Sequence, residues 1–143
     1  MQFTCILCLS KFAYDLTLTD MKVYWKMPSG LHTSYSKELL LYGKYLKENN
    51  LQLAWRQLER AHVLGQPWAV EHTQVHWIML KFGFRIKNWH EILGQIPRLL
   101  VGGVKSFVGK IPVGNTGGAN VPPLRPMEIP DDLKEMMKPY LGV

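Results

Sequence analysis

The sequence predicts an all-α protein: two antiparallel helical hairpins of the tetratricopeptide-like type, then an extended Pro/Gly-rich strap and a short terminal helix. Apolar residues recur at spacings of three and four between residues 33 and 107, which is the pattern of amphipathic helices. Asn, Gly and Lys-Asn turn signals divide this region into four stretches of helical length. No stretch gives a strong strand pattern, and 143 residues suffice for one domain.

The first hairpin has the clearer repeat signature. Its first helix is expected over residues 33–49, where Ser34 or Ser36 can cap the start and an Asn-Asn pair ends the helix, because Asn tolerates the left-handed turn conformation. Its second helix is expected over residues 51–64, with Gly65 as the C-terminal cap. The apolar spacing of this pair is similar to that of a tetratricopeptide helix-turn-helix.

The second hairpin follows the same scheme less closely. A helix over residues 67–86 is apolar on most of its circumference, which is typical of a central, buried helix. After a turn at residues 87–88, a further helix is expected over residues 89–107, and Pro97 inside it predicts a kink or a break. The core side of this last helix is expected to consist of Ile92, Ile96, Leu99, Leu100 and Val104.

The composition changes after residue 109. Residues 110–130 contain five prolines and a Gly/Asn-rich run over residues 114–120, which together predict an irregular, extended strap. A short amphipathic helix is expected after Asp131, which can cap it. The apolar side of that helix, expected to dock on the core, consists of Leu133, Met136, Met137 and Tyr140.

These patterns predict three parts of the chain. Residues 1–30 form an N-terminal extension outside the compact domain, residues 31–109 form the four-helix domain, and residues 110–143 form the strap and terminal helix packed on that domain. Met21 and Met27 could each act as an internal start. We therefore expect the cooperative melt to survive deletion of residues 1–27.

Composition excludes several classes of protein. The net charge of +6 is spread along the chain without a basic run, which argues against a nucleic-acid-binding protein. No apolar stretch reaches the ~18 residues that a membrane-spanning helix needs, and the N-terminus lacks the features of a signal peptide. Cys5 and Cys8 have no second pair at zinc-site spacing. We expect reduced thiols and a cytoplasmic location.

Three of the five histidines flank the loop between the second and third helices. Positions equally far from the loop of an antiparallel pair face each other, so His62 should meet His72, and Glu59 should meet His76 one turn further on. Glu59 and His62 are three residues apart, and His72 and His76 are four apart, so each pair shares a helix face. The sequence therefore predicts a box of three imidazoles and one carboxylate.

Imidazole and carboxylate together are the ligands of divalent metals such as Zn²⁺, Fe²⁺ and Mn²⁺. The metal hypothesis places the ion on Glu59, His62, His72 and His76. Two alternatives stay open from the residues alone: histidines that are buried, neutral and hydrogen-bonded, and a metal-free acid/base or ligand site. The sequence shows no pattern typical of a Ser-His-Asp or Cys-His catalytic site, so it does not assign a reaction.

Three blocks of the sequence resemble a known family. Residues 54–67 (AWRQLERAHVLGQP), 72–77 (HTQVHW) and 114–121 (GNTGGANV) are similar to those of short bacterial proteins classed as a domain of unknown function. The resemblance covers roughly residues 33–140 and implies no activity. It favours the metal hypothesis, because it suggests a place near heavy-metal efflux genes.

The sequence thus favours a small metal-binding helical protein, either a metal-dependent enzyme or a metal-homeostasis protein. The alternative is a non-catalytic, tetratricopeptide-like interaction module that binds a partner protein or a second copy of this chain. A third hypothesis is an anion site on the backbone of residues 114–120.

Overall fold

The computed structural model describes residues 20–21, 24–105 and 111–141. In order, the elements are β1 (Asp20–Met21), α1 (Ser29–Lys47), α2 (Leu51–Gly65), α3 (Ala69–Arg85), α4 (Trp89–Lys105), β2 (Ile111–Pro112) and α5 (Asp131–Leu141). The predicted all-α class is confirmed. The two strands are two residues each and form one antiparallel ladder, with Asp20 opposite Pro112 and Met21 opposite Ile111.

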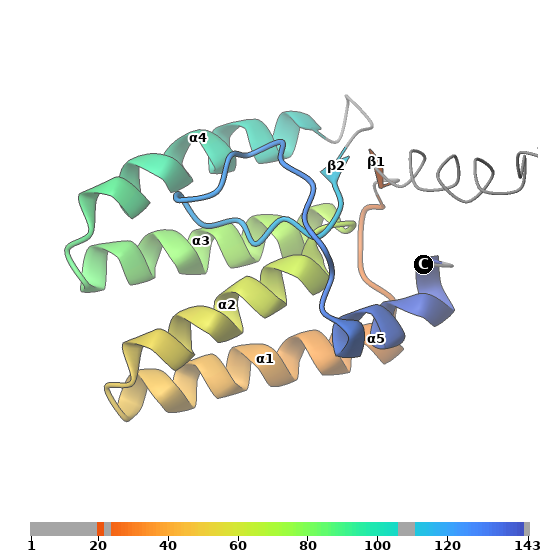
Figure 1. Cartoon of the computed structure of the whole chain (residues 1–143), viewed down its shortest axis with the longest axis horizontal. Coiled ribbons are helices and arrows are strands. Elements are labelled where there is room, and N and C mark those ends of the chain that lie inside the picture. The colour runs from red at the N-terminus through yellow and green to blue at the C-terminus, as the bar shows by residue number, and fades with distance from the viewer. Residues whose placement is uncertain (1–19, 22–23, 106–110, 142–143) are drawn as a thin grey trace, which may run out of the picture.

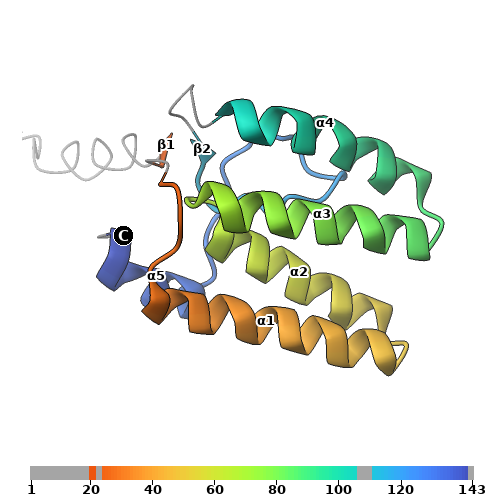
Figure 2. The same cartoon turned by 180° about the vertical axis from the view of Figure 1, so that it is seen from behind.

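The helices α1 to α4 lie side by side in chain order and run in alternating directions (Figures 1 and 2). Contacts join α1 to α2, α2 to α3 and α3 to α4. The strap that leads from β2 to α5 crosses one face of α2, α3 and α4, and α5 lies against α1 and α2 (Figure 1). Tetratricopeptide-like packing of the helices stays a prediction.

The start of α1 differs from the sequence-based expectation. The helix begins at Ser29, four residues early, with Pro28 as N-cap at φ −59°, so Ser34 and Ser36 lie inside the helix and cap nothing. Pro28 lies just outside the helix, with ψ 142°, and proline suits a helix start because it has no N–H to leave unpaired. Leu31 is almost fully buried, and its burial stabilises a first turn that local propensity alone would not favour.

The turns between helices agree with the expected residues. Asn49 and Lys87 both have φ 55°, the left-handed conformation that ends a helix, and the Asn50 side chain caps α2 by accepting from the Leu53 N–H at 3.2 Å. Of the kink or break expected at Pro97, the break is wrong, because α4 continues through this residue to Lys105. The kink stays a prediction.

The expectation that Gly65 caps α2 is also wrong. Gly65 is the last helical residue, and Gln66 after it has φ −52° and ψ −40°, which is right-handed. Glycine favours close packing here: a Cβ on Gly65 would lie 3.3 Å from the carbonyl carbon of Glu71 and 3.3 Å from the Tyr35 ring, so these neighbours would have to shift. Gly65 thus lets the end of α2 approach both α3 and α1.

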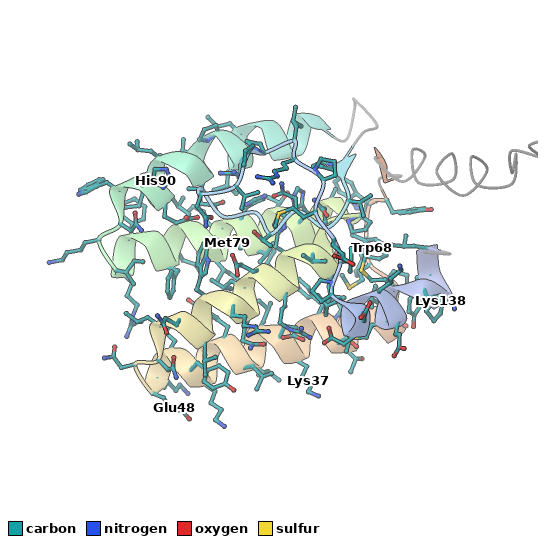
Figure 3. All side chains as sticks on the ribbon, in the orientation of Figure 1. Lys37, Glu48, Trp68, Met79, His90 and Lys138 are labelled. Atoms are coloured by element: carbon teal, nitrogen blue, oxygen red, sulfur yellow. The ribbon has the colours of Figure 1, made fainter. Side chains whose placement is uncertain are left out.

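One core joins α1, α2, α3 and α5. Trp68 and Met79 lie inside it, whereas Lys37 and Lys138 lie at the outer edge (Figure 3). Its other fully or nearly fully buried apolar residues include Leu31, Tyr35, Ala54, Leu58, Ala61, Leu64, Val75, Phe82, Leu133 and Met137.

The outer faces of α3 and α4 are more apolar than expected. Trp77 and Phe84 on α3 are each more than half exposed, so α3 is not buried all round as its composition predicted. On α4, Ile92 is buried, but Ile96 is 40% exposed and Leu100 is 72% exposed. The predicted core side of α4 is therefore wrong for these two residues.

Residues 24–28 run beside the start of α3. The Tyr24 N–H donates to the Pro67 carbonyl at 2.7 Å, and the Met27 N–H donates to the Glu71 carboxylate at 3.2 Å. Met27 is buried in the core, although the sequence assigned it to the extension. The boundary of the compact domain stays a prediction, and Cys5 and Cys8 lie outside the described residues.

Within the part of the chain that the structure describes, no helix combines the length and apolar character needed to cross a membrane.

Candidate metal centre

Three imidazole nitrogens meet between α2 and α3. The Nε2 atom of His62 lies 2.9 Å from Nε2 of His72 and 3.1 Å from Nε2 of His76, and the last two Nε2 atoms are 3.1 Å apart. His62 comes from the last turn of α2, and the other two come from the first half of α3. The predicted convergence of these three histidines is thus present, and we call them the histidine triad.

The local fold explains why the rings converge. His72 and His76 are one helical turn apart, so both side chains project from one side of α3. The short connection of residues 66–68 returns the chain beside α2, which places His62 opposite them. All three side chains are buried, at 2%, 8% and 3% exposure for His62, His72 and His76.

The strap fixes the tautomer of His62. Its Nδ1 atom lies 2.8 Å from the carbonyl oxygen of Asn115, and a carbonyl can only accept, so Nδ1 carries the proton. In the neutral ring Nε2 then presents a lone pair to the triad. Asn115 is held in turn, because its side-chain amide donates to the carbonyls of Pro122 and Arg125.

Gln95 on α4 fixes the tautomer of His76 in the same way. The Gln95 amide nitrogen donates to Glu91 Oε1 at 2.6 Å and to the Gly117 carbonyl at 2.9 Å. Because both partners are acceptors, the Gln95 oxygen must be the atom that faces His76 Nδ1, at 2.7 Å. His76 Nδ1 therefore donates, and its Nε2 atom also presents a lone pair to the triad.

The lone pairs of His62 Nε2 and His76 Nε2 thus face each other across 3.1 Å, and both side chains are buried. Such an arrangement is unfavourable unless a positive charge or a hydrogen-bond donor lies between the nitrogens. A metal ion satisfies all three Nε2 atoms at once. A proton on His72 Nε2, shared with the other two nitrogens, is the metal-free alternative.

The size of the triangle suits a metal ion. For metal–nitrogen bonds of about 2.0–2.1 Å, Nε2 atoms about 3 Å apart subtend about 95° at the ion. That angle lies nearer to the ~90° of one face of an octahedron than to the ~109° of a tetrahedron. The histidine triad would therefore occupy one face of the ion and leave further positions on the other side.

Burial and the neighbouring rings perturb His62. Loss of water lowers the pKa of His62 well below its ordinary value of 6.5, and the imidazoles of His76 and His72 lower it further, while the bond to Asn115 opposes the shift. A neutral imidazole is the form that binds a metal.

Glu59, the fourth predicted ligand, does not belong to the group of ligand atoms that lie within 4.8 Å of one another. Burial raises the pKa of Glu59, and the nearby side chains of Trp55 and Thr116 oppose that shift. Helix residues three apart still differ in direction by about 60°, and the strap enters beside Glu59. The prediction that Glu59 lies opposite His76 considered only the two helices and did not include the strap.

Gln95, Asn115 and Glu91 are functional candidates that the sequence interpretation missed. Gln95 is fully buried, and Glu91 and Asn115 are 6% and 2% exposed. The available signal was a polar pair at spacing four, positions 91 and 95, on the side of α4 that contains the buried Ile92. Asn115 and Gly117 lie in the predicted strap and carried no separate signal.

The backbone of residues 114–120 is partly committed to internal bonds. The Gly117 N–H donates to the Asn115 side chain at 3.0 Å, and the Ala119 N–H donates to Glu91 at 3.0 Å. An anion would have to compete with both acceptors, which weighs against the hypothesis of an anion site.

Comparison with known proteins gives one family. A family model described as "Protein of unknown function (DUF3703)" matches residues 29–137, a range that contains the histidine triad, Gln95 and the strap. No curated protein and no solved structure matches the chain significantly.

Proposed function

Because the chain belongs to the family of proteins of unknown function DUF3703, whose description assigns no activity, we propose a function from the site alone. The protein binds one divalent transition-metal ion through the Nε2 atoms of His62, His72 and His76. The observation that supports this proposal is the pair of second contacts, from Asn115 and Gln95, that leave two facing Nε2 atoms without a proton.

The donor set favours some metals over others. Neutral imidazole suits Zn²⁺ and Fe²⁺, whereas Mn²⁺ prefers carboxylate and water oxygens. Glu59 was the only carboxylate among the predicted ligands and does not join the triad. Among the three metals expected from the sequence, Zn²⁺ and Fe²⁺ are therefore favoured over Mn²⁺.

The surroundings of the histidine triad favour a closed metal-binding site over a catalytic one. A catalytic metal keeps an open position that substrate can reach. Here the strap lies directly on the triad, since a Cβ on Gly117 would come within 2.5 Å of the His62 ring, and all three histidines are buried. A role in metal homeostasis fits these contacts better than a metal-dependent enzyme.

The substitution His72→Ala tests the proposal. Removing one of three ligands should lower metal content after purification from about one ion per chain to near zero, and should abolish the rise in melting temperature on adding Zn²⁺ or Fe²⁺. Elemental analysis and thermal denaturation with and without metal give both readouts.

The matched control is His90→Ala, because His90 is an exposed histidine on α4 outside the triad (Figure 3). This variant should keep the metal content of the parent protein. A His72→Ala protein that holds metal as well as the parent would disprove the site.

One observation favours the alternative function, a non-catalytic interaction module. Trp89, Leu93, Ile96 and Leu100 follow one another at spacings of four, three and four on α4, and each is at least 40% exposed. A stripe of this kind often marks a protein–protein contact. The double substitution Leu93→Ser and Leu100→Ser should then change the oligomeric state in analytical ultracentrifugation without changing metal content.

A further inference from the structure

The buried carboxylate of Glu91, which reaches the histidine triad through Gln95, indicates that residues beyond the direct ligands contribute to the metal centre. We propose that Glu91 is the counter-charge of the bound ion, and that Gln95 is the positioning residue that connects Glu91 to His76. This inference rests on the proposed function, and it adds two residues outside the direct ligands that set the affinity for a divalent ion.

Three groups form the connection, which we call the Glu91 relay. Glu91 Oε1 accepts from the Gln95 amide nitrogen at 2.6 Å, and the Gln95 oxygen accepts from His76 Nδ1 at 2.7 Å. Gln95 has no alternative orientation, because its nitrogen also donates to the Gly117 carbonyl. A flipped amide would place its oxygen against two acceptors.

Among the residues that the structure describes, none supplies Glu91 with a direct counter-ion. Its oxygens accept from Gln95 and from the Ala119 N–H at 3.0 and 3.3 Å. Across the side chains that the structure describes, no cationic nitrogen lies within 4.0 Å of its carboxylate. Arg98 acts on Glu91 only at longer range, and its guanidinium donates to the carbonyls of Gly94, Gly118 and Val121.

A carboxylate that is 6% exposed and has no ion pair is costly in the metal-free protein. The histidine triad has the opposite deficit, because three neutral ligands leave the charge of a divalent ion uncompensated. The Glu91 relay connects the unpaired negative charge of Glu91 to the uncompensated positive charge of the ion through the hydrogen-bonded amide of Gln95. Negative charge on Glu91 strengthens the Gln95 oxygen as an acceptor, and that acceptor raises the electron density that His76 Nε2 offers to the ion.

The isosteric substitution Glu91→Gln tests the inference on the full chain. It removes the charge and keeps the shape, so Zn²⁺ affinity should fall about 10- to 100-fold, as for other residues that orient metal ligands. Affinity is measured by competition with a chromophoric chelator. The melting temperature of the metal-free variant should stay equal or rise, because an unpaired buried charge is removed.

Two further variants separate charge from structure. Glu38→Gln removes a different buried carboxylate, one that pairs with Arg60 at 3.0 Å, and it should leave Zn²⁺ affinity unchanged. Gln95→Met keeps the volume and the Glu91 charge but interrupts the relay, so its affinity should fall like that of Glu91→Gln. ¹⁵N spectra of the His76 ring in the metal-free state should then lose the single Nδ1–H tautomer.

The outcomes distinguish this inference from the proposed function. If the parent protein binds no metal, the proposed function is wrong, and the role proposed for Glu91 and Gln95 is wrong with it. If the parent binds Zn²⁺ and both Glu91→Gln and Gln95→Met bind it equally well, the relay is disproved while the metal site stands. Should Glu91→Gln fail to fold, the Gln95→Met comparison decides in the same way.

Discussion

At the scale of single residues, the enclosed ring of His62 makes the metal-free fold sensitive to acid. The unfolded chain takes up a proton at His62 as pH falls through about 6.5, but the folded chain does not, because burial lowers the pKa of His62 well below that value. Stability from this residue is complete above pH 6.5 and is lost as pH falls toward the folded pKa.

We therefore predict that the metal-free protein is less stable at pH 5 than at pH 7.5. The contribution of His62 to the free energy of unfolding should fall by up to about 2 kcal/mol over this interval, at about 1.4 kcal/mol per pH unit below 6.5. Urea unfolding in the presence of a chelator measures it. His62→Gln should show a smaller difference between the two pH values, and an equal difference would contradict the account.

The type of each residue also decided which members of the site could be predicted from the sequence. Histidines are rare enough that three of them around one loop predicted a common pocket, and the structure shows the triad. Glu59 does not join the triad, because a carboxylate on a helix can bond to many neighbours and helix spacing alone does not say which one. Gln95 was missed because an amide becomes recognisable as part of a metal centre only when its partners are known.

At the scale of elements, the strap acts as a lid fixed to the helices. It bonds to His62 through Asn115, to Gln95 through Gly117 and to Glu91 through Ala119. Sequence predicted an extended strap from its prolines and glycines, but it did not predict the face on which the strap lies. That choice depends on buried donors and acceptors of α2 and α4, which composition does not reveal.

Gly117→Ala tests the seating of the strap. Gly117 has φ 79°, and an added Cβ would lie 2.5 Å from the His62 ring. The substitution should lower the free energy of unfolding by about 1–3 kcal/mol and should weaken metal binding as the strap shifts. Urea unfolding and metal titration measure the two effects.

Gly43→Ala is the matched control, because Gly43 lies inside α1 with nothing within 4 Å of the added Cβ. It should stabilise the protein by about 0.5–1 kcal/mol through helix propensity. If Gly117→Ala were as stable as Gly43→Ala, the strap could not be seated against His62.

At the scale of the whole molecule, Arg60 ties three helices together. From α2 its guanidinium bonds to Glu38 on α1 and to Asp132 on α5, and this pairing lowers the pKa of Asp132. Leu133 and Met137 of α5 are fully buried in the core. The terminal helix therefore joins the core through these two residues. The other two residues expected on its docked side, Met136 and Tyr140, are 36% and 39% exposed, so the expected face is wrong for them.

The start of the compact domain is tested by two deletions. A chain that begins at residue 24 keeps the buried Met27 and its bond to Glu71, whereas a chain that begins at residue 28 loses both. Burial of a Met side chain is worth about 1.5–3 kcal/mol. We expect both chains to melt cooperatively, the shorter one at a lower temperature, in differential scanning calorimetry. Equal melting temperatures would show that residues 24–27 contribute nothing to the core.

The sequence by itself determined the helices and the approach of three histidines, because apolar periodicity, turn residues and spacing about a short loop act over a few positions. Only the tertiary structure decided which polar groups surround those histidines. Gln95 lies 19 positions after His76, and Asn115 lies 53 positions after His62. Glu91 reaches the site only through Gln95, four positions further along α4, so the roles of all three follow from hydrogen-bond geometry. A buried donor bonds to whichever acceptor the packing brings within about 3 Å, and no local sequence pattern encodes that choice.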